Sequence, residues 1–160
     1  MVVLRSIFLF FIILCLNNVF TQEIRQENLT NRERLYWDIG NKKIRARGSY
    51  YQDNIIGVTN EKHGKWWFYN AKGDLTEEQH FYRGRIHGKQ ISYHPGKRMA
   101  SESYFVFNVA DSIFREWSTE GQLIVEGFYN MGSPDGEWKY FYKDGALKSR
   151  KQISNDSVYL

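Results

Sequence analysis

The strongest pattern of apolar and polar positions along this chain is a block of 24 residues that recurs four times in tandem. The blocks begin at Gly64, Gly88, Ser112 and Gly136. A period between about 20 and 50 residues indicates one supersecondary unit that has been copied in tandem. Copied positions usually hold such a repeat together, so the pattern predicts architecture before it predicts chemistry.

Each block contains two β-favouring stretches around a turn. In the first block, aromatic Lys65–Tyr69 and then Leu75–Tyr82 flank the turn Asn70–Asp74, and a second turn follows at Arg83–Gly84. Asn, Gly and Asp tolerate the positive φ that tight hairpins need. A single hairpin is marginally stable in water, so neighbouring copies must pair edge to edge. We therefore predict an all-β fold, a single elongated, twisted antiparallel meander of tandem β-hairpin repeats of about 24 residues.

Aromatic and aliphatic side chains recur at fixed offsets from the first residue of each block. Offset two carries Trp66, Gln90, Phe114 and Trp138, and offset five carries Tyr69, Tyr93, Trp117 and Phe141. Strict strand alternation places these two columns on opposite faces of the sheet. Either both faces are partly aromatic, or a bulge lies between the columns.

The repeats also define the expected organisation of the chain. A degenerate leading hairpin with a long joining loop, Asn54–His63, occupies 34–63, and a polar linker or short helix occupies 22–33. The units themselves and the C-terminal tail then follow at 64–87, 88–111, 112–135, 136–153 and 154–160.

The first 21 residues are typical of an export signal. Arg5 precedes the unbroken apolar run Ile7–Leu16, which is too short for a membrane-spanning helix of roughly 20 residues. Thr21 is a small residue that suits cleavage before Gln22. We expect the protein to be exported to the periplasm, the cell envelope or the medium; an uncleaved anchor is the alternative.

Composition narrows the classes of function. The single cysteine, Cys15, lies inside the signal, so the mature chain has no disulfide and no thiolate metal site. Without Arg5 the chain has 21 basic and 18 acidic side chains, and they are interspersed. This weak excess argues against a nucleic-acid partner and gives little attraction to an anionic membrane surface.

The repeat resembles the MORN-repeat variant found in bacterial proteins. That unit has the approximate form G-x-W-x-x-Y-x-x-x-G-x-L-x-x-E-x-x-Y-x-x-G-x-x-x-G, and the resemblance covers roughly 40–153. The first block matches it at Gly64, Trp66, Tyr69, Gly73, Leu75, Glu78, Phe81, Gly84 and Gly88. The resemblance implies an elongated, curved antiparallel sheet. It also implies a scaffold or a protein- and lipid-contacting module, and many bacterial members carry an antitoxin label.

Two polar columns raise the question of chemistry. Glu78, Glu102 and Glu126 share offset fourteen, and successive members are about 9.6 Å apart if each unit adds two strands. That distance is near the ~9.5 Å upper limit for the two carboxylates of an inverting glycosidase, but nothing indicates the raised pKa of a general acid. We therefore expect a solvated repeat position.

The second column, which precedes each block, holds His63, His87, Asp111 and Asp135. Members about 9.6 Å apart are too far from one another to share one ion, so polar turn residues explain this column better than a metal site. Sequence motifs of nucleophiles and of phosphate-binding loops are missing too. We predict no catalytic, cofactor-binding or metal site, no cofactor, and no enzyme activity.

The aromatic excess points to a contact surface. In Trp66–Tyr69, four successive aromatics cannot all face one core. We expect an aromatic-rich face, rimmed by Lys and Arg, to bind another protein or act as a scaffold. The predicted surface consists of Trp66, Trp67, Tyr69, Tyr93, Trp117, Trp138 and Tyr140. A carbohydrate-binding module of the cell envelope is the first alternative, and an antitoxin-like inhibitor is the second. The opposite possibility is that sheet curvature and long basic stems cover both faces.

The proposed signal gives a direct test. If residues 1–21 are an export signal, the exported protein begins at Gln22, and N-terminal sequencing of the protein released from the cytoplasm will show this residue. Intact Met1 on membrane-bound protein would instead indicate the uncleaved anchor.

Overall fold

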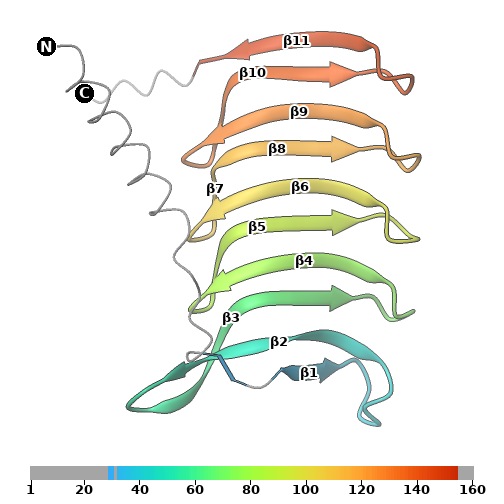
Figure 1. Ribbon diagram of the computed structural model, residues 1–160. Coiled ribbons are helices and arrows are strands. Elements are labelled where there is room, and N and C mark those ends of the chain that lie inside the picture. Colours follow the sequence, from blue (N-terminus) through green and yellow to red (C-terminus); the bar gives the residue numbers. More distant parts are fainter. Residues whose placement is uncertain (1–28, 31, 155–160) are drawn as a thin grey trace, which may run out of the picture.

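The computed structural model describes residues 29–30 and 32–154, and the described chain forms one antiparallel β-sheet (Figure 1). The predicted signal, residues 22–28 and 31 of the predicted linker, and residues 155–160 of the tail lie outside these residues. No helix of the described chain has the length and apolarity needed to cross a membrane. The strands are β1 (Glu33–Tyr36), β2 (Ile44–Asp53), β3 (Gly57–Tyr69), β4 (Leu75–Tyr82), β5 (Arg85–Tyr93), β6 (Met99–Val106), β7 (Val109–Ala110), β8 (Ser112–Trp117), β9 (Leu123–Asn130), β10 (Ser133–Phe141) and β11 (Leu147–Ile153).

The strands follow one another in chain order across the sheet, from β1 to β11, with the short β7 pairing only with β6. Every pair of neighbours is antiparallel, and Figure 1 shows the hairpins side by side in one ribbon. The predicted all-β meander is confirmed. Each 24-residue unit adds two strands, so equivalent residues of successive units lie two strands apart.

The turns between units share one left-handed geometry. Their central residues are Arg83–Gly84, Phe107–Asn108 and Met131–Gly132, and all six have positive φ. Two successive positive φ values are typical of the type I′ turn, whose twist matches that of the flanking strands. Each turn also donates to the carbonyl oxygen two residues before the first residue of the same unit. The bonds run from the amides of Gly84, Asn108 and Gly132 to Lys62, Ile86 and Ala110, all at 2.8 Å.

The first residue of each unit lies in a bulge. Gly64, Gly88, Ser112 and Gly136 all have positive φ, between 68° and 102°. The strand register shifts around these positions, so extra residues sit on the first strand of each unit. A bulge of this kind bends the strand, and Figure 1 shows the bend recurring in successive units. In the third unit Ser112 adopts the positive-φ backbone conformation that glycine adopts in the other three units.

The two aromatic columns lie on opposite faces. Trp66 packs with Phe68 and Phe81 on one face, which we call the core face. On the other face the Arg47 guanidinium lies over the rings of both Trp67 and Tyr69. A register irregularity does occur just before each offset-five ring, but its extra residue is on the partner strand. Alternation along the ring-bearing strand is therefore kept, and both faces are partly aromatic.

Two tryptophans of the core face pack against glycine. Trp66 is 0% and Trp138 is 6% exposed. Their rings lie over Gly48 and Gly127, where an added Cβ would come within 2.3 Å of a ring carbon. Neither glycine has a positive φ, so the close approach of the indole explains them better than backbone conformation does. Trp66 also donates from Nε1 to the Ser49 carbonyl oxygen at 2.8 Å.

The segment that sequence analysis treated as a joining loop is largely a strand. Residues 57–63 belong to β3, which pairs with β2 through Gln52 and Val58, and only 54–56 form the turn. The Asp53 carboxylate accepts hydrogen bonds from the amides of Ile55 and Ile56 at 2.8 and 3.2 Å. This side-chain cap closes the turn. The loop prediction was wrong because 57–63 lacks the usual strand alternation, with apolar Val58 exposed and polar Thr59 and Glu61 partly buried.

The glycine–indole contact makes a testable prediction. Gly127→Ala should lower the free energy of unfolding by roughly 1–3 kcal/mol, because the added methyl overlaps the buried Trp138 ring. The cost should fall below about 1 kcal/mol in a Trp138→Leu background, where the ring is gone. Urea unfolding of the two single variants and the double variant measures this coupling.

Ser103→Ala is the matched control, since Ser103 holds the same offset in another unit. Its free energy of unfolding should stay within about 0.5 kcal/mol of the wild-type value. Equal losses for Gly127→Ala with and without the indole would contradict the packing account.

Candidate functional site

The structure divides the seven residues of the predicted contact surface between two faces. Trp66 and Trp138 are buried on the core face, and Tyr140 lies on that face by strand alternation from Trp138. Placing the two tryptophans on a contact surface was therefore wrong. Their rings are held against glycine instead of facing solvent.

The other four predicted residues share the opposite face, which we call the ladder face: Trp67, Tyr69, Tyr93 and Trp117. Each of the four is partly exposed. Strand alternation adds Phe141 at the same offset in the last unit. Tyr69, Tyr93, Trp117 and Phe141 therefore form one aromatic stripe, in which neighbours are separated by about 9.6 Å across two strands.

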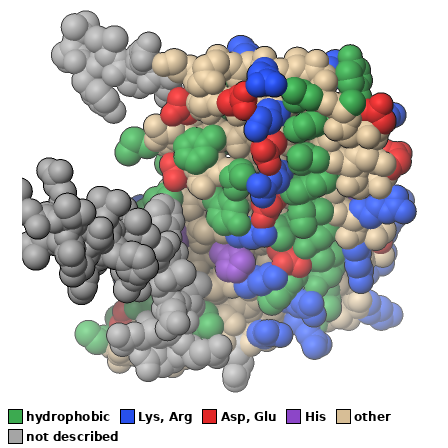
Figure 2. Space-filling view, turned by 45° about the horizontal axis from the view of Figure 1, so that its top comes forward, with side chains coloured by type: hydrophobic (Ala, Val, Ile, Leu, Met, Phe, Trp, Pro, Cys, Tyr) green, Lys and Arg blue, Asp and Glu red, His purple; other side chains and the backbone are tan. Residues whose placement is uncertain are grey.

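A row of charged residues runs beside this stripe. Strand register places the following residues opposite one another in turn across the sheet: Trp67, Glu78, Ile91, Glu102, Arg115, Glu126, Lys139 and Arg150. We call this row the charge ladder. Figure 2 shows acidic and basic side chains alternating in a column next to a column of hydrophobic side chains. The aromatic stripe and the charge ladder together define the candidate site.

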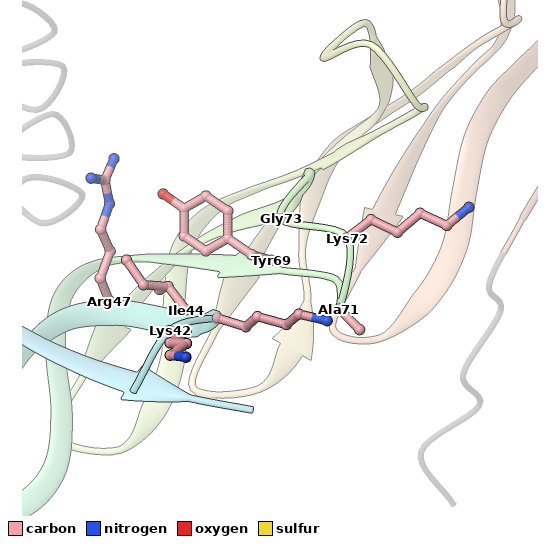
Figure 3. A pocket seen from close by; sticks show the side chains of 8 residues that line it. Lys42, Ile44, Arg47, Tyr69, Ala71, Lys72 and Gly73 are labelled. Atoms are coloured by element: carbon pink, nitrogen blue, oxygen red, sulfur yellow. The ribbon is translucent and has the colours of Figure 1, made fainter. Parts of the chain in front are cut away.

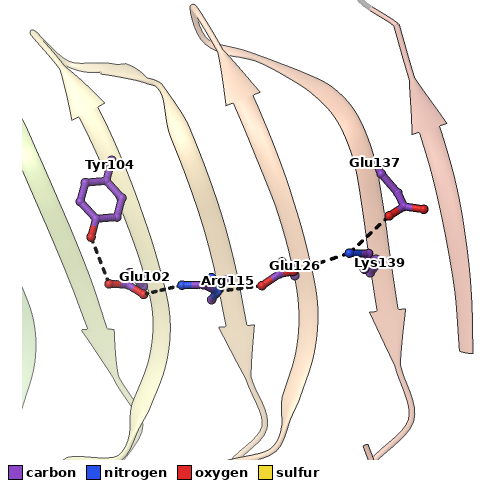
Figure 4. Close-up of polar contacts among 6 residues, drawn as sticks. All are labelled: Glu102, Tyr104, Arg115, Glu126, Glu137 and Lys139. Atoms are coloured by element: carbon purple, nitrogen blue, oxygen red, sulfur yellow. Dashed lines mark hydrogen bonds and ion pairs between the residues drawn. The ribbon is translucent and has the colours of Figure 1, made fainter. Parts of the chain in front are cut away.

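Ion pairs connect the ladder from strand to strand (Figure 4). Arg115 links two strands, with Nε 2.9 Å from Glu126 Oε2 and a terminal nitrogen 3.6 Å from Glu102 Oε2. Lys139 continues the chain of contacts, 4.0 Å from Glu126 and 3.3 Å from Glu137. Directly opposed charges of opposite sign stabilise an antiparallel pair, so the ladder helps to hold the register that creates it.

Glu102 is the most deeply placed charge of the ladder. It is 8% exposed and pairs with both Lys89 and Arg115, while the Tyr104 hydroxyl donates to it at 3.4 Å. The hydrogen bond to Glu102 raises the pKa of Lys89 above its ordinary value, although burial opposes this. Lys89 is thus held in its charged form.

Glu78 and Tyr93 connect the ladder to the stripe. Burial acts to raise the pKa of Glu78, but hydrogen bonds from Lys65 and Tyr93 outweigh it, and the pKa is lowered. Burial, followed by the hydrogen bond to Glu78, raises the pKa of Tyr93 to about 12. The carboxylate therefore stays ionised and the phenol stays neutral at physiological pH. A general acid would need a carboxyl that keeps its proton, which is the reverse of this arrangement.

Two members of the column of His and Asp before each unit accept hydrogen bonds from the turns between units. The Arg83 amide donates to Nδ1 of His63 at 3.1 Å, and the Met131 amide donates to Asp111 at the equivalent place, at 3.3 Å. Burial lowers the pKa of His63, which keeps its ring neutral and able to accept. Among the described residues, no group of three or more His, Cys, Asp or Glu side chains could hold a metal ion.

Sequence analysis missed the basic half of the ladder. Arg115 and Lys139 share offset three with Trp67 and Ile91, so no single kind of residue recurs in this column. The available signal was pairing: with two strands per unit, offset three must face offset fourteen, where Glu78, Glu102 and Glu126 stand.

The comparison with protein families decides what the repeat is. Residues 134–155, which cover β11 and nearly all of β10, match the MORN repeat variant. This match supports a MORN-repeat variant protein. This repeat and the open antiparallel sheet fit a module for binding or scaffolding.

Other comparisons add little to the MORN-repeat assignment. The search among curated proteins gave no match. One solved structure, described as the crystal structure of a GtfA/B complex bound to UDP and GlcNAc, aligns at 15% identity with a TM-score of 0.28. The alignment covers 69% of this chain and 20% of that chain. A TM-score this low does not establish a shared fold.

The burial of Glu102 makes a prediction about the ladder. Glu102→Gln should lower the free energy of unfolding by roughly 1–3 kcal/mol, because it leaves Lys89 and Arg115 against a neutral amide. Glu137→Gln is the matched control, since its side chain is 37% exposed, and it should cost less than about 1 kcal/mol. Urea unfolding at neutral pH checks both, and equal effects of the two substitutions would refute the special place of Glu102.

Proposed function

We propose that this protein is a non-enzymatic repeat module that binds a protein partner through its ladder face. The observation that carries the proposal is the aromatic stripe of Tyr69, Tyr93, Trp117 and Phe141, which recurs at one spacing and stays partly exposed. The chain buries Trp66 and Trp138 completely or nearly so on the other face. The chain can therefore bury large rings, whereas the four rings of the stripe stay partly exposed.

The composition of this face suits a protein partner. Interface cores are enriched in Tyr, Trp and Phe and depleted of free charge. In the charge ladder, Glu102, Arg115 and Glu126 already pair with one another, so covering them does not leave single charges unpaired. The stripe spans about 29 Å over three steps of about 9.6 Å, which is long enough for an extended contact.

The same rings also support the carbohydrate-binding alternative, because equally spaced flat side chains can stack on sugars. An antitoxin-like inhibitor is the third proposal and rests on the bacterial members of the repeat family. We further propose that the protein acts after export, which the apolar run Ile7–Leu16 supports. A cytoplasmic inhibitor would have no use for such a run.

Substitution in the stripe tests the proposal. A partner isolated by cross-linking and pull-down with the full chain should bind purified wild-type protein directly. Trp117→Ala should weaken that binding at least about tenfold, since aromatic residues at the centre of an interface dominate its energy. Met131→Ala is the control: Met131 is 80% exposed at a turn away from the stripe, and this variant should stay within about twofold of wild type.

Thermal unfolding of both variants separates loss of contact from loss of fold. Equal affinity of Trp117→Ala and wild type for the partner would contradict the proposed contact face. Retention of wild type but not Trp117→Ala on a polysaccharide affinity gel, with no protein captured, would favour the carbohydrate-binding module instead.

A further inference from the structure

A hollow of about 380 Å³ opens where the leading hairpin meets the first repeat (Figure 3). Its lining carries four cationic side chains, Lys42, Lys43, Arg47 and Lys72. Tyr69, the first ring of the aromatic stripe, also lines it, and Figure 3 shows Tyr69 beside Arg47. The lining has no Asp or Glu among the residues that the structure describes.

The cations of this hollow differ from those that lie in or next to the charge ladder. Lys65, Lys89, Arg115, Lys139 and Arg150 each lie within ion-pair distance of a glutamate. Within the described part of the chain, none of the four cations that line the hollow forms a carboxylate ion pair. The hollow therefore brings together four cations that form no ion pair with a carboxylate of the described residues.

Aromatic rings hold Arg47 in place, and its guanidinium donates no hydrogen bond to any residue that the structure describes. Its guanidinium carbon lies 5.1 Å from the centre of the Trp67 ring and 5.6 Å from the centre of the Tyr69 ring. Such cation–π contacts restrict the side chain, while the N–H groups in the plane of the guanidinium remain able to donate. Arg47 is therefore a pre-organised fork for a carboxylate, which it can bind through two parallel hydrogen bonds.

We propose that this hollow binds an acidic peptide segment, and that the segment belongs to the partner of the ladder face. The inference rests on the proposed function and adds the chemistry of the partner. Several cations spread around one hollow suit several carboxylates along a peptide better than one compact anion. Because Tyr69 belongs to both the hollow and the stripe, a partner that lies along the stripe reaches the hollow at its end.

The test uses the full chain and a fluorophore-labelled hexaglutamate peptide, with labelled hexaglutamine to control for the dye. Fluorescence anisotropy should show binding of hexaglutamate and no binding of hexaglutamine, and the affinity for hexaglutamate should fall as salt is added. Arg47→Gln and the double variant Lys42→Gln/Lys72→Gln should each weaken it at least about tenfold. Lys143→Gln is the matched control, since Lys143 lies in the corresponding turn of the last unit, and it should stay within about twofold.

Several outcomes would overturn the inference. They are no binding of hexaglutamate, an equal loss in Lys143→Gln, and displacement of the peptide by inorganic phosphate at lower concentration than by free hexaglutamate. Binding of phosphatidylserine vesicles without hexaglutamate binding would overturn it as well. If the purified partner binds Arg47→Gln and Lys42→Gln/Lys72→Gln normally but loses Trp117→Ala, this inference fails while the proposed function stands.

Discussion

Strand register is the constraint on which both faces of this sheet depend. Side chains alternate along a strand, so a slip of one residue would move Glu102, Arg115 and Glu126 to the core face and bring Trp138 to the ladder face. Two backbone features set the register in every unit. They are the left-handed turns such as Arg83–Gly84 and the positive-φ residue at the start of each repeat. The unit length of 24 residues keeps these features in line across the sheet.

The same register produces different interactions on the two faces. On the core face, an indole at offset two lies over a glycine of the preceding strand, as Trp138 does over Gly127. On the ladder face, carboxylates and cations meet across strands and neutralise one another, and the aromatic stripe runs beside them. In the leading hairpin around Arg47, the cations that line the hollow have no carboxylate ion pair among the described residues. The ladder face therefore carries paired charges beside its aromatic stripe and a cationic hollow at the first ring of that stripe.

Much of this fold could be predicted from the sequence, because turns and strand alternation are local properties. The hairpins, the turns at Asn70–Asp74 and Arg83–Gly84, and the antiparallel order follow from residue type and period alone. The burial of Trp66 could not be predicted in this way, since it depends on Gly48, which lies in the preceding unit. The strand at 57–63 was missed because apolar Val58 is exposed while polar Thr59 and Glu61 are partly buried, which is the reverse of the usual alternation.

The candidate site was predictable in part. Tyr69, Tyr93 and Trp117 lie together on one face as their common offset suggests, because a shared offset means a shared face. The ladder needed the pairing of two different offsets, and the hollow needed the leading hairpin to be placed against the first turn. The charge ladder and the hollow both depend on which strands lie side by side, and one column of equivalent residues does not give that information.

The register itself can be measured in solution by nuclear magnetic resonance. The account predicts backbone proton contacts that link Glu102 with Arg115 and Arg115 with Glu126 as directly opposed pairs. Contacts that link Glu102 with Phe114 or Glu116 instead would show a register slipped by one residue. Such a slip would contradict the charge ladder, the aromatic stripe and the separation of the two faces together.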